Sequence, residues 1–78
     1  MNYDNVRKNL ERANKGLLAL RKKMSIDEYL EDRYLVRQVC IASVALACLN
    51  EGVDDYLAFQ LSLNKEDRLL LLDLTGER

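Results

Sequence analysis

The feature that most constrains this chain is a stripe of apolar residues near its N-terminus. The apolar side chains recur at intervals of three or four residues: Tyr3, Val6, Leu10, Ala13, Leu17, Leu20 and Met24. Side chains at this spacing share one side of an α-helix. Asp4 or Asn2 is placed to cap the start of such a helix, and the basic residues 21–23 suit the negative pole of its dipole. The sequence therefore predicts a long first helix with one buried face.

The next segment opens with a pattern typical of a helix start. Ser25 and Glu28 have the spacing of a reciprocal capping box, in which each side chain bonds the backbone N–H of the other residue. Two alternatives fit the residues that follow. The chain forms either one helix to about Asn50, or a short helical turn over residues 26–31 followed by a longer helix capped by Asp32.

The C-terminal third predicts two short helices. Gly52 is expected to end the central helix in the left-handed conformation, and Asp54 is placed to cap a helix of about ten residues. Asn64 is placed to cap a final helix over Lys65 to Leu74, which residues 75–76 would close.

Together these segments predict a single all-α domain over residues 1–78. No segment shows the alternation typical of β-strands, and no repeat or linker divides the chain. A chain of 78 residues is also too short for two independent cores. We expect an antiparallel bundle of three to four helices, with a long first helix, a buried second helix and a short C-terminal helical pair.

Two segments have little polar face. From Tyr34 to Leu49 the chain is rich in apolar residues on every side, which is typical of a central helix covered by several partners. Four consecutive leucines, residues 69–72, sweep about 300° around the last helix. Either the bundle surrounds that helix or it lies at a subunit interface. The candidate interface residues are Leu69, Leu70, Leu71, Leu72 and Leu74.

The absence of histidine excludes several function classes. The chain has no Ser-His-Asp or Cys-His nucleophile system, no histidine-ligated zinc and no imidazole acid or base. On one helix, Cys40 and Cys48 would lie about 12 Å apart, which is too far for a disulfide. We expect both to be buried thiols in a reducing compartment. The sequence predicts no enzyme, no cofactor and no metal site.

No targeting segment is visible in the sequence. The N-terminus is polar where a signal peptide carries a basic start and an apolar run. The longest nearly uninterrupted apolar stretch, Val39 to Leu49, has eleven residues, whereas a membrane-spanning helix needs about 20. We therefore expect a soluble, cytoplasmic protein without membrane contact.

An aromatic and acidic connector, followed by a helix of small residues, carries a family resemblance. The run Tyr29 to Cys40 and the helix Ile41 to Leu49 resemble the middle of the HEPN-type helical bundles and of short bacterial helical proteins related to them. Further similar segments lie at residues 13–18, 55–61 and 64–70. Active HEPN ribonucleases carry an arginine and a later histidine on one helix. Arg37 is the nearest match to the arginine, but the histidine is missing, so the resemblance implies a dimerising interaction or regulatory module and not RNA cleavage.

Charge is unevenly distributed along the chain. Residues 1–24 hold seven basic and two acidic side chains, a net charge of +5, whereas residues 25–78 hold five basic and eleven acidic ones, a net charge of −6. Four basic residues lie opposite the apolar stripe of the first helix: Lys8, Arg12, Lys15 and Lys22. Such a ridge can follow a phosphate backbone, although the whole chain has a pI of about 5.3 and no aromatic residue is interleaved with the ridge. A solvated face, or one facing an acidic segment of another subunit, is the simpler interpretation.

Two further charged groups are weaker candidates. Arg33 and Arg37 lie one helical turn apart and are placed to contact an anionic phosphate or carboxylate. The acidic residues 27–32 do not form a calcium-binding loop, and part of them is explained by helix capping.

The leading hypothesis is a non-catalytic interaction or regulatory module that acts as a homodimer or binds another protein. The alternative is a nucleic-acid-binding protein that uses the basic face of the first helix.

Overall fold

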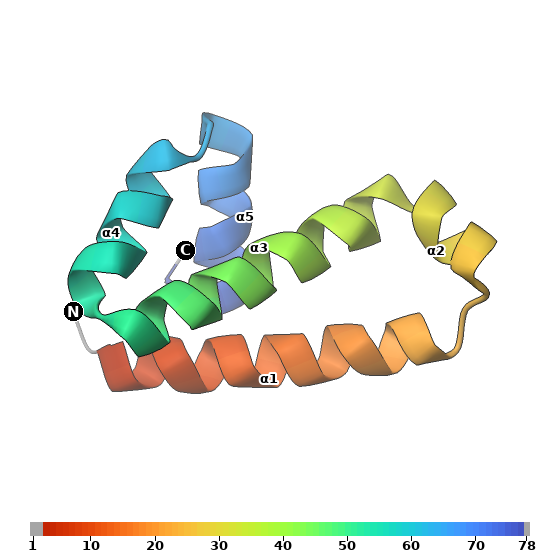
Figure 1. Ribbon diagram of the computed structural model, residues 1–78, viewed down its shortest axis with the longest axis horizontal. Helices are drawn as coiled ribbons and strands as arrows, with labels where there is room; N and C mark the ends of the chain where they lie inside the picture. Colours follow the sequence, from red (N-terminus) through yellow and green to blue (C-terminus); the bar gives the residue numbers. More distant parts are fainter. Residues whose placement is uncertain (1–2, 78) are drawn as a thin grey trace.

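The computed structural model describes residues 3–77 and folds them into five α-helices (Figure 1). Their bounds, in chain order, are α1 Tyr3–Lys22, α2 Ile26–Glu31, α3 Arg33–Glu51, α4 Val53–Ser62 and α5 Lys65–Thr75. No strand occurs among these described residues. The predicted all-α fold class is therefore confirmed.

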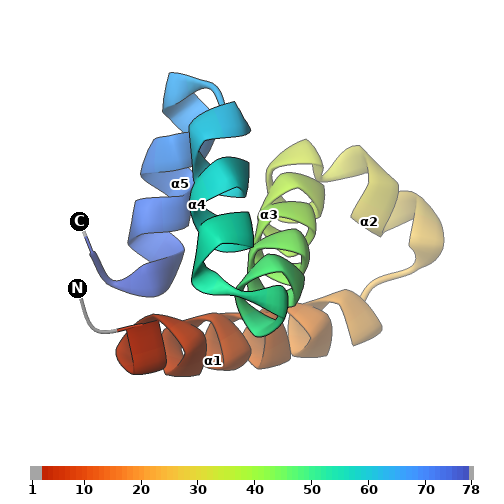
Figure 2. The same ribbon diagram turned by 60° about the vertical axis from the view of Figure 1, so that its left-hand side comes forward.

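The helix α3 is central, because it contacts each of the other four helices. It runs in the opposite direction to α1 and crosses it at an incline (Figure 1). The antiparallel pair α4 and α5 stands at one end of this arrangement, where α4 contacts α3 and α5 contacts both α1 and α3 (Figure 2). The short α2 packs against the start of α3 at the other end. The long first helix, the central helix and the C-terminal pair all match the sequence prediction.

The two alternatives for residues 25–50 are resolved in favour of two helices. The side chain of Ser25 accepts a bond from the backbone N–H of Glu28, and Glu28 accepts one from the backbone N–H of Ser25, each at 3.1 Å. This capping box starts α2. Asp32 then leaves the helical conformation, with φ −84° and ψ 80°, and its carboxylate accepts a bond from the N–H of Leu35. One acidic residue therefore both separates α2 from α3 and caps α3.

The helix ends in the C-terminal third differ in part from the sequence prediction. Gly52 does end α3, but its φ of 159° and ψ of 160° describe an extended backbone and not the left-handed one. Asp54 lies inside α4 and does not cap it, since the N-cap is Gly52 and no side chain bonds the first turn. Asn64 caps α5 as predicted, and Gly76 closes it in the left-handed conformation with φ 73°.

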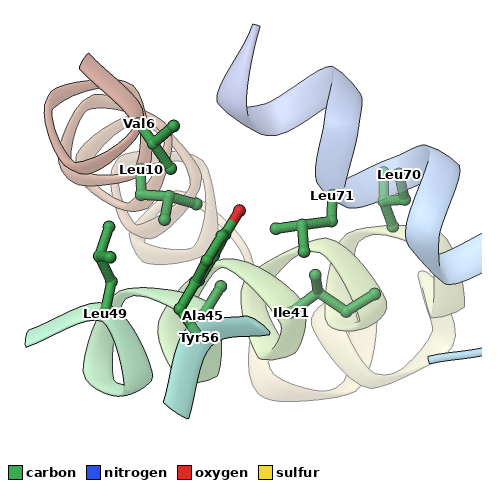
Figure 3. Close-up of a cluster of buried hydrophobic side chains, with 8 residues drawn as sticks. All are labelled: Val6, Leu10, Ile41, Ala45, Leu49, Tyr56, Leu70 and Leu71. Atoms are coloured by element: carbon green, nitrogen blue, oxygen red, sulfur yellow. The ribbon is translucent and has the colours of Figure 1, made fainter. Parts of the chain in front are cut away.

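The main core lies where α1, α3, α4 and α5 meet (Figure 3). Its buried side chains are Val6, Leu10, Ile41, Ala45, Leu49, Tyr56, Leu70 and Leu71. A smaller cluster of Leu17, Leu35 and Ala42 continues the α1–α3 contact. Burial of apolar side chains from four helices supplies most of the stabilisation of such a domain. The predicted apolar stripe of α1 includes Leu20, but this side chain is 52% exposed and is not part of the core.

Polar side chains of α1 donate hydrogen bonds to groups at the C-terminal ends of α3 and α5. The guanidinium of Arg7 donates to the backbone oxygen of Leu49 and to the side chain of Asn50, near the C-terminal end of α3. The amide of Asn9 donates to the backbone oxygen of Thr75 at the end of α5, at 2.6 Å. Carbonyls in a last helical turn lack helical partners, so these contacts satisfy them and set the register of α1.

The prediction that the second helix is buried holds for only part of its surface. Side chains on one side of α3 are buried, but Tyr34 is 61% exposed and Val44 is 40% exposed. Cys40 is also exposed and Cys48 is half-buried, so the expectation of two buried thiols is wrong for Cys40. The reason is geometric: the neighbours of α3 gather on one side of it and leave a strip uncovered.

Candidate interaction surface

The leucines predicted to form a subunit interface are largely internal. Leu71 is fully buried and Leu70 is 8% exposed, and both belong to the main core. Leu69, Leu72 and Leu74 are half-buried. Because α5 turns its leucines toward α1 and α3, the prediction is corrected for Leu70 and Leu71: the bundle itself surrounds this side of the helix.

The main exposed apolar surface lies instead on α2 and the open side of α3. Ile26 is 75% exposed and Leu30 is 60% exposed, and they lie one turn apart on α2. Val36, Cys40 and Val44 follow at four-residue intervals along α3, so they share one side of that helix. We call these five residues the α2–α3 face.

An open groove crosses the α2–α3 face. It has a volume of about 580 Å³ and is lined by Leu30, Arg33, Val36, Arg37 and Cys40. Leu30, Val36 and Cys40 give the groove an apolar lining, and Arg33 and Arg37 are the charged residues that line it. A second apolar surface placed over this groove would remove its apolar lining from water.

Exposed charges of both signs lie on α2 and at the start of α3. On α2, Asp27 and Glu31 are exposed, and neither has an ion pair within the described part of the chain. On α3, Arg33 is exposed and likewise has no ion pair among residues 3–77. On α2, the hydrogen bonds from the backbone and side chain of Ser25 hold the pKa of the Glu28 carboxyl below its ordinary value.

The two arginines predicted as an anion contact have different environments. The Nε of Arg37 lies 2.7 Å from Oδ1 of Asp67 and its Nη2 lies 3.5 Å from Oε2 of Glu66, so Arg37 ties α3 to the start of α5. The carboxylate of Asp67 is four-fifths covered. An incoming anion would have to displace this carboxylate from Arg37. Arg33 is therefore the arginine that remains available to a partner.

The basic residues predicted on the first helix form an exposed ridge. The buried side chains of α1 are Val6, Leu10 and Leu17. Four exposed basic residues lie away from them: Lys8, Arg12, Lys15 and Lys22. No ion pair involves these four within residues 3–77. The structure thus brings together the basic face that the sequence predicted.

The described part of the chain contains no candidate metal site. Residues 3–77 contain no group of three or more acidic, cysteine or histidine side chains positioned to hold a metal ion. Burial, aided by the negative charge of Glu77, raises the pKa of the Tyr56 hydroxyl. Its ring packs edge-on against Tyr3 with ring centroids 6.3 Å apart, which is a core contact.

The helix α3 also meets the length and composition criteria for a membrane-spanning segment. The core helix of a bundle meets the same criteria, and five side chains of α3 are buried against the other helices. We therefore interpret α3 as the central helix of the bundle.

Sequence reasoning missed the α2–α3 face. One signal was present: Ile26 and Leu30 share one side of a six-residue helix, while Tyr29 lies on another side and reaches the smaller core cluster. A helix this short cannot bury all three side chains against a single neighbour.

Comparison of the chain with family models, with curated proteins and with solved structures finds no match.

Proposed function

We propose that this chain is a non-catalytic helical interaction module that acts as a homodimer. The observation that carries the proposal is the exposed α2–α3 face, where Ile26 and Leu30 are largely in solvent. A chain of 78 residues buries a smaller fraction of its surface than a larger domain does, so covering such a face adds a substantial share of stability. The internal position of Leu70 and Leu71 moves the proposed contact from α5 to α2 and α3.

Sedimentation equilibrium tests the oligomeric state. We expect a mass of twice the 9.0 kDa of one chain at tens of micromolar. Leu30→Glu places a charge in the groove and should give a monomer with unchanged helix content. Leu61→Glu is the matched control, because Leu61 is 76% exposed on α4, away from the α2–α3 face, and this variant should stay dimeric. A wild-type chain that remains a folded monomer across this range would contradict the proposal.

The exposed ridge of α1 supports a second candidate function, binding of a nucleic-acid backbone. Four basic side chains lie on one side of a single helix without internal acidic partners among the described residues: Lys8, Arg12, Lys15 and Lys22. Removing one of these side chains from a phosphate should make the slope of log affinity against log salt shallower by about one. Gel retardation of RNA and DNA at low salt tests this candidate.

The matched variants for that assay reverse charge on and off the ridge. The triple change Lys8→Glu, Arg12→Glu and Lys15→Glu should abolish retardation while preserving helicity. Lys65→Glu, an exposed charge reversal at the start of α5, should retain it. Absence of retardation by the wild-type chain at low salt would exclude the candidate.

A catalytic role is tested separately from binding. The chain lacks histidine and Arg37 is paired with Asp67. We therefore expect no turnover of RNA by the purified protein. Turnover that disappears in Arg37→Ala would contradict the non-catalytic assignment.

A further inference from the structure

We infer that the occupant of the α2–α3 face is the same face of a second copy, related by a two-fold axis, with Glu31 of each copy paired to Arg33 of the other. This inference rests on the proposed homodimer and specifies its contact surface. A two-fold interface uses one patch on both subunits, so the patch must complement itself in shape and in charge.

The shape of the face meets this requirement. Ile26 and Leu30 project from α2 and are 75% and 60% exposed. Leu30 also lines the open groove of about 580 Å³, together with Val36, Cys40 and the two arginines Arg33 and Arg37. Each copy carries both the projecting Ile26 and the groove, so a two-fold contact allows Ile26 of each copy to pack against the groove of the other.

The charges of the face meet the requirement as well. Acidic Asp27 and Glu31 lie on the α2 side, and basic Arg33 lies at the start of α3, all of them exposed. In a two-fold contact of two such faces, the acidic residues of α2 in one copy meet Arg33 of the other copy. A face with a single sign of charge, such as the ridge of α1, would repel its own copy.

A charge exchange between copies tests this pairing directly. A dimer of the Arg33→Glu variant has two acidic side chains in each of its two pairs. A dimer of the Glu31→Arg variant has two basic side chains in each pair. Both pairs are therefore repulsive in either homodimer. We expect each variant alone to dimerise about tenfold more weakly than wild type, as two exposed charge pairs change from attraction to repulsion. In the mixed dimer, one pair is the native Glu31–Arg33 pair, and the other pair joins the two substituted positions with their charges exchanged. Both pairs are then attractive, so the mixed dimer should recover wild-type affinity within about threefold.

Both changes suit the helix ends at which they are made. Arg33 is the first residue of α3, where an acidic side chain favours the helix dipole, and Glu31 is the last residue of α2, where a basic one does. Circular dichroism should therefore show full helix content for each variant. Native mass spectrometry separates the two homodimers from the mixed dimer by mass.

A matched control makes the same change at another helix start. Lys65→Glu alters the first residue of α5, outside the α2–α3 face, and should leave dimerisation unchanged. The weakening in the two test variants should also shrink as salt is raised.

The outcomes separate this inference from the function on which it rests. A wild-type dimer that the two variants weaken, without recovery on mixing, overturns the Glu31–Arg33 pairing and leaves the homodimer in place. A wild-type dimer that neither variant weakens overturns the α2–α3 contact surface itself. A wild-type chain that stays monomeric would contradict both the proposed homodimer and this inference.

Discussion

Truncation of Leu71 is the most direct test of the fold. Leu71 has no exposed surface and lies in the main core, between α5 and the helices α1 and α3 (Figure 3). Leu71→Ala removes three carbon atoms from a closed site and leaves a cavity that the rigid helices around it only partly fill. Such changes cost about 2 to 5 kcal/mol of unfolding free energy, and the full burial of Leu71 places it in the upper half of that range.

This cost is large relative to the stability of a small domain. At about 0.05 to 0.15 kcal/mol per residue, a chain of 78 residues has an unfolding free energy of about 4 to 12 kcal/mol. A decrease of about 3.5 to 5 kcal/mol in Leu71→Ala is therefore a third or more of the total over most of this range. It should lower Tm by about 15 °C or more.

Urea denaturation followed by circular dichroism measures the decrease. Leu61→Ala is the matched control, because it makes the same change on a helix at a side chain that is 76% exposed, so any difference in helix propensity cancels. We expect the control to change stability by about 0.5 kcal/mol or less. Both changes are best made in the Leu30→Glu background, which removes the concentration dependence that a dimer adds. A decrease below about 1 kcal/mol for Leu71→Ala, or equal decreases in both variants, would refute the assignment of Leu71 to the core.

Three further expectations concern the helix interiors and ends. Gly16 is exposed within α1, and an added Cβ meets nothing within 4 Å, so Gly16→Ala should raise the urea midpoint by an amount equivalent to about 0.5 to 1 kcal/mol. Gly76 has φ 73°, and an added Cβ would lie 3.1 Å from Nδ2 of Asn9, so Gly76→Ala should lower stability by about 1 kcal/mol or more in the same assay. The folded-state pKa of Glu28 lies below its ordinary value of 4.5, so its stabilising contribution is fully present above about pH 4.5 and is lost as pH falls through the folded-state pKa. An NMR titration of the Glu28 carboxyl should show this lowered pKa in wild type. Ser25→Ala keeps the backbone N–H that donates to Glu28 and loses only the hydroxyl, so the pKa should stay lowered there by a smaller amount. An ordinary pKa in wild type would contradict the capping contribution.

Local patterns predicted the helices and most of their ends. The capping box of Ser25 and Glu28, the cap of Asn64 and the end of α5 at Gly76 each depend on contacts between residues a few positions apart. Gly52 and Asp54 are the exceptions: α4 begins directly after α3, so Gly52 serves as both the end of one helix and the start of the next. No room remains between them for a separate cap.

The candidate sites were predictable to different degrees. The basic ridge of α1 was predicted correctly, because the apolar stripe on the opposite side of the same helix defines which way it faces. The interface on α5 was predicted incorrectly. Four consecutive leucines surround most of the helix, so the sequence does not indicate which of them are buried. Only the position of α1 and α3 decides that Leu70 and Leu71 point into the core. The pairing of Arg37 with Asp67 joins residues 30 positions apart, which no local pattern reveals.

The sequence by itself determined the all-α class, the long first helix and the point at which the central helix ends, since helical periodicity and capping act over a few residues. The tertiary structure alone decided which side of α3 stays open. That side depends on where four separate helices cross α3, and an apolar sequence around its whole circumference is compatible with any of those crossings. The exposed α2–α3 face, and with it the proposed dimer contact, is a consequence of those crossings.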